Sequence, residues 1–130
     1  MERKVVITVG DRQEKAELND SRVAQAIWEK LPISAQVSTW GEEIYFEIPV
    51  KTKIDRPVRE VAKGDLCYWP NGACFCIFFG PTPMSSGDKI IPASEVEIIG
   101  KLVTTDYAGL KTARDGQPVR IERAERGKSG

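Results

Sequence analysis

The sequence contains no histidine, and this absence excludes several kinds of active site. Without an imidazole there is no Ser-His or Cys-His nucleophile pair and no histidine-ligated metal. Net charge is absent as well, because 19 Lys and Arg residues balance 19 Asp and Glu residues. No long-range field therefore favours nucleic acid or an anionic membrane surface, and we expect neither as a partner.

Long apolar runs are also missing. Residues 5–9 form a short apolar run after basic residues, but no small-residue cleavage site of a signal peptide follows it. No run approaches the roughly 18 apolar residues that a membrane-spanning helix needs. We therefore expect a soluble, cytoplasmic protein with no membrane partner.

Cysteine is scarce, with Cys67, Cys74 and Cys76 as its three residues. An odd number of cysteines so close together is not typical of a secreted disulfide framework. If Asn71-Gly72 forms a two-residue turn, Cys67 lies directly opposite Cys76, and Cys74 lies on the same side of its strand as Cys76. This leaves two alternatives, a Cys67–Cys76 bridge where local geometry permits it or three free thiols. Three cysteines without histidine fall short of a tetrahedral metal site, so no metal and no cofactor is expected.

The sequence does contain many short strand signals. They lie at residues 5–9, 15–18, 33–40, 44–50, 66–69, 73–79, 89–91 and 96–103, with an edge strand at 119–123. One helix is predicted over about residues 21–31, where capping side chains precede an apolar stripe and Pro32 follows it. Short strands separated by turns predict a mainly β fold, a closed or nearly closed antiparallel β-barrel. At this length we expect a single domain over residues 1–130, with a less ordered C-terminal extension at 104–130 and fraying at 127–130.

Three motifs resemble the small prokaryotic cyclophilin-like family. They are residues 43–50 (EIYFEIPV), 64–70 (GDLCYWP) and 78–83 (FFGPTP). The likeness covers about residues 5–103 and does not reach the tail. It implies an eight-stranded cyclophilin-type barrel with a helix, in a family whose biochemical role is unassigned.

True cyclophilins are peptidyl-prolyl isomerases, and the resemblance to them breaks at the catalytic positions. Glu47 stands where the cyclophilin Phe-His-Arg-Ile run has the Arg that bonds the prolyl nitrogen, and an ionised carboxylate cannot donate that bond. Cys76 replaces a pocket-lining Phe, while Met84 and Lys89 stand where an aromatic pocket residue and a His are common. Residues 51–63 have no Gln-Gly-Gly-Asp-Phe segment. The resemblance therefore implies that the fold is kept and the catalytic set is lost.

Strand alternation predicts a groove on the outer side of the barrel. Tyr45 and Glu47 point away from the core of their strand, where they could join Trp69 and the loop at 81–84 in a site for a small molecule or an extended, proline-containing peptide. Ordinary barrel packing of each aromatic is the competing interpretation. The expected ligand-binding residues are Tyr45, Glu47, Trp69, Phe75, Cys76 and Met84, with Lys89 as a further donor.

Three functions remain open at this point. The first is ligand binding without the usual isomerase chemistry, the second is a weak or atypical peptidyl-prolyl isomerase, and the third is a subunit of a larger enzyme assembly. A carboxylate at Glu47 would favour a cationic or hydrogen-bond-donating ligand. The competing interpretation is that Glu47 is a solvated or ion-paired strand charge.

Overall fold

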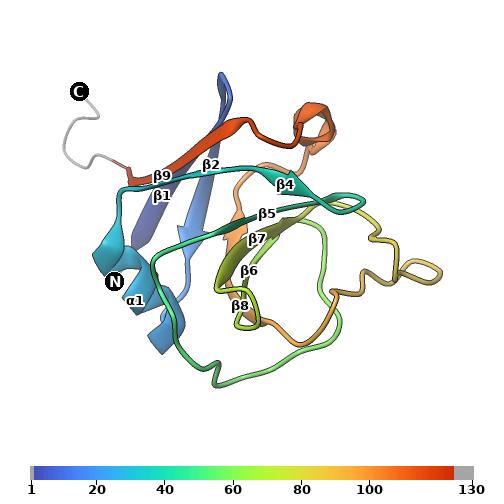
Figure 1. The fold of residues 1–130 in the computed structure, drawn as a ribbon, viewed down its shortest axis with the longest axis horizontal. Helices are drawn as coiled ribbons and strands as arrows, with labels where there is room; N and C mark the ends of the chain where they lie inside the picture. The colour runs from blue at the N-terminus through green and yellow to red at the C-terminus, as the bar shows by residue number, and fades with distance from the viewer. Residues whose placement is uncertain (1, 125–130) are drawn as a thin grey trace.

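Residues 2–124, the part of the chain that the computed structural model describes, fold mainly into antiparallel strands (Figure 1). The elements are β1 (Arg3–Val9), β2 (Arg12–Leu18), α1 (Arg22–Lys30), β3 (Ile33–Gln36), β4 (Ser38–Thr39), β5 (Glu43–Glu47), β6 (Asp65–Trp69), β7 (Cys74–Phe78), β8 (Glu97–Leu102), the 3-10 helix η1 (Ala108–Thr112) and β9 (Pro118–Arg123). The nine strands form one sheet in the order β3-β9-β1-β2-β8-β6-β7-β5-β4. This is the mainly β barrel with one α-helix that the sequence predicts.

The barrel nearly closes at Val37, which joins the two ends of the sheet. The sequence predicts one strand over residues 33–40, but β3 pairs with β9 while β4 pairs with β5. Between them, the Val37 amide donates to the Gln117 carbonyl at 2.9 Å and the Val37 carbonyl accepts from the Gly116 amide at 2.8 Å. The chain therefore changes partners at Val37, and the predicted strand is two strands.

The helix closes one end of the barrel and begins and ends close to where the sequence places it. Ser21 caps it, since its Oγ accepts from the Ala24 amide at 3.1 Å. Val23, Ala24 and Ile27 are buried against the barrel, as expected for an amphipathic helix packed on a sheet. Within the described part of the chain, no helix is long and apolar enough to cross a membrane.

Strand alternation separates two apolar clusters on the two sides of the sheet. Inside the barrel, β5, β6 and β7 contribute Ile44, Phe46, Leu66, Tyr68, Phe75 and Ile77. Their neighbours along the same strands point outward, and the outer cluster includes Cys67, Cys74, Cys76 and Phe78, with Val61, Ile90 and Val96 from the connecting segments. The outer face of this half of the barrel is therefore covered by two long connections, residues 48–64 and 79–96 (Figure 1).

The C-terminal segment contributes more to the fold than the sequence predicts. The strand at 119–123 is not an edge strand, because β9 lies between β1 and β3 and pairs with both. Its Val119 and Ile121 are buried in the core, and η1 precedes it within the segment expected to be less ordered. The predicted fraying at 127–130 lies outside the described residues.

A second correction concerns residues 89–91, for which the sequence predicts a strand. The structure has only single bridges there, Val61 with Ile90 and Ser86 with Lys89. This segment packs across the outer face of the barrel instead of joining the sheet, so Ile90 is buried without a ladder.

The hairpin of β6 and β7 has the register that the sequence predicts. Cys67 pairs with Cys76 and Trp69 with Cys74, so the predicted cross-strand neighbours are confirmed. In the turn that joins the two strands, Ala73 has a positive φ of 54°, and its amide donates to the Pro70 carbonyl at 3.3 Å. All three cysteines are free and buried, which decides between the two alternatives in favour of thiols.

The three thiols are expected to be unreactive in the native protein. Burial raises the pKa of Cys74 to about 11 and raises the pKa of Cys67 and Cys76 well above the usual range. Because the thiolate is the reactive species, Ellman's reagent at pH 8 should react slowly with the folded protein and promptly with three thiols after unfolding in guanidinium. Fast stoichiometric labelling of the folded protein would contradict this burial.

Candidate functional site

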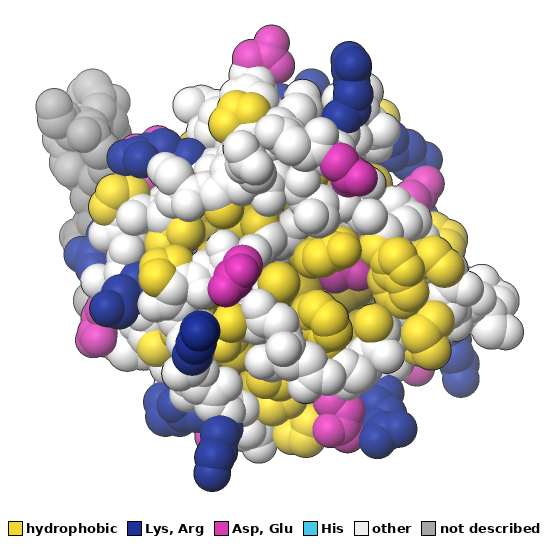
Figure 2. All heavy atoms as spheres, in the orientation of Figure 1, with side chains coloured by type: hydrophobic (Ala, Val, Ile, Leu, Met, Phe, Trp, Pro, Cys, Tyr) yellow, Lys and Arg dark blue, Asp and Glu magenta, His cyan; other side chains and the backbone are white. Residues whose placement is uncertain are grey.

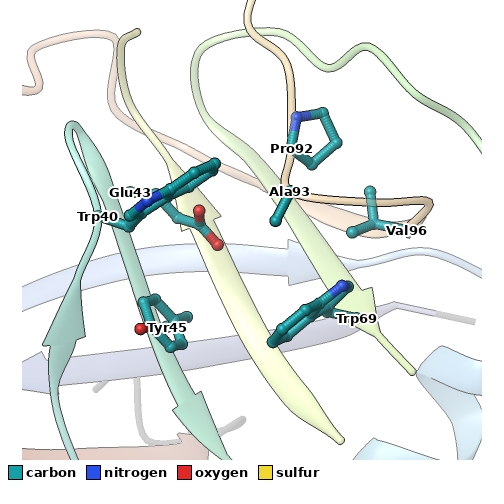
Figure 3. A pocket seen from close by; sticks show the side chains of 7 residues that line it. All are labelled: Trp40, Glu43, Tyr45, Trp69, Pro92, Ala93 and Val96. Carbon is teal, nitrogen blue, oxygen red and sulfur yellow. The ribbon is translucent and has the colours of Figure 1, made fainter. Parts of the chain in front are cut away.

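A cavity of about 250 Å³ opens on the outer face of the barrel beside β5 and β6. Its lining residues are Trp40, Glu43, Tyr45, Trp69, Pro92, Ala93 and Val96 (Figure 3). The space-filling view shows a hollow ringed by hydrophobic side chains with acidic atoms inside it (Figure 2). An apolar cavity with few polar groups is the usual form of a small-molecule site.

Strand β5 provides two of the lining side chains through simple alternation. Glu43 and Tyr45 lie on its outer face, opposite Phe78 and Cys76 of β7, while Ile44 and Phe46 point into the core. Trp40 precedes β5 in a tight turn, in which its amide donates to the Glu43 carbonyl at 3.0 Å. The turn brings the Trp40 ring back over the Glu43 side chain (Figure 3).

The opposite wall comes from the connection between β7 and β8. Trp69, at the end of β6, donates from Nε1 to Ser94 Oγ at 2.6 Å, which ties the segment with Pro92 and Ala93 to the sheet. The same connection also packs against the turn before β5. A Cβ on Gly41, which has a φ of +62°, would lie 2.9 Å from the Pro81 carbonyl oxygen, so glycine permits this close approach.

Glu43 gives the cavity its polar character. Its residue surface is only 6% exposed, and no ion pair involves it within residues 2–124. Burial raises the pKa of the Glu43 carboxyl to about 7, and a hydrogen bond from the Cys76 thiol acts in the opposite direction. A buried carboxyl with a perturbed pKa that faces a cavity is a candidate functional group.

The structure places two of the sequence-predicted site residues in this cavity, Tyr45 and Trp69. Cys76 is buried in the outer apolar cluster and does not line the cavity. Phe75 faces the barrel interior, where its ring stacks on Phe46 with centroids 5.4 Å apart.

The other three predicted residues lie elsewhere on the surface. Glu47 is exposed and borders a separate shallow hollow with Lys51 and Asn71. Met84 is 54% exposed, and Lys89 is exposed as well. Neither lines the cavity.

Five of the residues that line the cavity were not among the site residues predicted from the sequence. Only one of them, Glu43, lies in a sequence pattern from which its place could have been predicted. Glu43 has the same alternation phase as Tyr45, so the prediction that placed Tyr45 outward applies to it equally. Trp40, Pro92, Ala93 and Val96 lie in turns or irregular segments, whose direction is set by long-range packing.

Comparison with known proteins shows which family the chain belongs to. The sequence model described as cyclophilin-like matches residues 3–122. The chain belongs to the cyclophilin-like family. Because the match extends through most of β9, the C-terminal strand is part of the family domain, whereas the motif likeness ends near residue 103.

A solved relative supports the same assignment for this cyclophilin-like protein. The hypothetical protein AF2241 from Archaeoglobus fulgidus, known from a solution structure, is 37% identical over 95% of each chain, with a TM-score of 0.80. No curated protein matches the sequence. The relative therefore supports the fold and the family, and its printed description states no activity.

Proposed function

We propose that this cyclophilin-like protein binds a small molecule in the cavity between β5, β6 and the segment at 92–96, without the usual isomerase chemistry. The observation that carries the proposal is the cavity itself, whose aromatic and aliphatic walls surround one buried carboxyl group. Its volume of about 250 Å³ lies just below the range of roughly 300–1,000 Å³ typical of drug-sized ligands. A small metabolite or the end of a longer ligand fits this size.

The polar groups of the cavity do not suit prolyl isomerisation. The barrier to amide rotation is about 18–20 kcal/mol, and the cyclophilin resemblance implies that an Arg lowers it by bonding the prolyl nitrogen. Among the described residues that line the cavity there is neither Arg nor Lys. Glu47, at the aligned position, lies outside the cavity and is an acceptor when ionised.

We expect at most a marginal acceleration of Xaa-Pro isomerisation. Exchange NMR on a short proline peptide, with and without the protein at pH 7, measures this directly, and an ordinary cyclophilin is the positive control. Exchange rates comparable to those of the control would contradict the proposal and would require a different donor to the prolyl nitrogen.

Ligand binding can be tested through the three tryptophan indoles. Trp40 and Trp69 line the cavity. Trp28 lies on α1, away from the cavity lining, and the Arg123 guanidinium carbon lies over its ring, 4.4 Å from the ring centroid. In an NMR fragment screen, true ligands should shift the indole signals of Trp40 and Trp69 and leave Trp28 unchanged. A diverse library without one such hit would contradict the proposed function.

A second candidate ligand is an extended peptide, which one further observation favours. The hollow next to the cavity shares Pro92 and Ala93 with it, and the hollow that borders Glu47 shares Pro70 and Asn71 with that neighbour. The three hollows thus follow one another along the surface. A peptide that uses them all should also shift the amide signals of Arg59 and Lys51, which line the second and third hollows, whereas a ligand confined to the cavity should not.

Glu47→Gln separates the cavity from this neighbouring surface. Because Glu47 is exposed and outside the cavity, the change should alter the free energy of unfolding by no more than about 0.5 kcal/mol. It should also leave the affinity of any cavity ligand unchanged. Denaturation curves and titration of the best fragment check both points. A clear loss of affinity would show that Glu47 takes part in ligand binding, as the sequence predicts.

A further inference from the structure

The cavity holds one acidic group among three aromatic rings. Figure 3 shows the Glu43 carboxylate pointing into the space between Trp40, Tyr45 and Trp69. These rings come from separate segments, the turn before β5, β5 itself and the end of β6. Of the described residues that line the cavity, Glu43 is the only Asp, Glu, Lys or Arg.

Such a group of side chains lacks a positive charge. Ring faces attract cations through their quadrupole, and aromatic cages are used to bind quaternary and methylated ammonium groups. A carboxylate that loses water on burial is unfavourable until a cation or donors compensate it. Within residues 2–124, no Lys or Arg forms an ion pair with Glu43.

We infer that the cavity binds alkylammonium cations, with the positive charge next to Glu43 and the alkyl groups against Trp40, Tyr45 and Trp69. The inference rests on the proposed function, because it names the ligand class of the same cavity. An anion would meet the carboxylate, and a neutral ligand would gain only the apolar contacts. The same cation can be a free amine or the methylated side chain of a lysine in a peptide, and the test separates these sources.

Affinity should rise with pH as Glu43 ionises. The titratable groups that face Glu43 are the Cys76 thiol on β7, with Cys67 and Cys74 near it, and Tyr45 on its own strand. Burial raises the pKa of all three thiols, so they stay neutral near pH 7. The cavity residues from the connection at 92–96 are Pro92, Ala93 and Val96, which carry no charge.

A matched ligand pair isolates the charge. Choline and 3,3-dimethylbutan-1-ol have the same shape, but a quaternary nitrogen in the first is a carbon in the second. NMR titration at pH 8, followed at the Trp40 and Trp69 indoles, should show choline binding at least about tenfold more tightly than the alcohol. Because choline does not titrate, its affinity should fall about tenfold from pH 8 to pH 6 in the wild-type protein.

Two variants assign the effect to one carboxylate. Glu43→Gln keeps the size of the side chain and removes its charge, so it should bring the two affinities to within about threefold and abolish the pH dependence. Glu47→Gln, four residues further along β5 on the same face, should preserve the full preference. Nα-acetyl-trimethyllysine amide is titrated in parallel, and tighter binding of this probe than of choline would identify a lysine side chain as the source.

The outcomes distinguish this inference from the proposed function. Equal affinities for choline and the alcohol in the wild-type protein would overturn the inference and leave a ligand-binding cavity. A preference for choline that persists in Glu43→Gln, or a flat pH profile in the wild-type protein, would overturn the role of Glu43. If Glu43→Gln does not fold, the wild-type ligand pair and pH series decide alone. If the protein binds neither choline nor the alcohol and no fragment shifts the Trp40 and Trp69 indole signals, the proposed function is contradicted as well.

Discussion

Phe75→Ala is expected to lower the free energy of unfolding by about 3–5 kcal/mol. The ring is fully buried inside the barrel and stacks on Phe46 with an interplanar angle of 18°. Its removal loses the transfer free energy of the ring and leaves a cavity that a barrel wall cannot collapse to fill. Since domains of this kind are stable by only about 5–15 kcal/mol, the variant should unfold at a much lower denaturant concentration than the wild-type protein.

Phe75→Leu is the control that separates packing from ligand binding. It keeps most of the apolar volume, so the expected loss is below about 1.5 kcal/mol, and the Trp40 and Trp69 indole signals should not move. A loss below about 1 kcal/mol in Phe75→Ala would contradict the placement of this ring in the core. A changed ligand affinity in a stable Phe75→Leu protein would instead support the prediction from the sequence that Phe75 belongs to the ligand-binding residues.

The barrel could be predicted because its strands carry local signals. Alternation over residues 44–50 correctly separates buried Ile44 and Phe46 from outward Tyr45, and the turn at Asn71-Gly72 fixes the register that pairs Cys67 with Cys76. The position of β9 carried no such signal. Its central place depends on pairing with β1, more than a hundred residues earlier in the chain, and a polar strand near the end of a sequence resembles an edge strand until its partners are known.

The site was predictable only in part, for a related reason. Alternation shows which face of β5 a side chain lies on, but it does not show which part of that face is covered. Glu43 and Glu47 share the outer face, and the connection at 92–96 covers the cavity beside Glu43 while Glu47 remains exposed. The cyclophilin resemblance directed attention to Glu47 because of its aligned position, whereas burial, which depends on tertiary packing, gives Glu43 the unusual environment.

The burial of Glu43 should make the empty protein less stable as pH rises. The pKa of the carboxyl is raised to about 7 in the folded protein, from an ordinary value of 4.5. Between these values the folded state holds a proton that the unfolded state has lost, so stability falls as pH increases through this window and the penalty is complete above pH 7. A difference of this size corresponds to about 3 kcal/mol.

Glu43→Gln should therefore stabilise the protein relative to wild type by an amount that grows with pH, from near zero around pH 4.5 to about 3 kcal/mol at pH 8. Any constant cost of burying the amide shifts the whole difference without changing its slope. Guanidinium denaturation of both proteins across this pH range gives the difference directly, and the other carboxylates cancel because both proteins share them. Glu47→Gln should follow the wild-type curve at every pH.

Parallel curves for Glu43→Gln and wild type would show that Glu43 is solvated or neutralised in the folded state, which would also remove the reason to place a cation beside it. A growing difference that choline reduces at pH 8 would instead show that this carboxylate lowers stability in the empty protein and gains a partner when the cavity is filled.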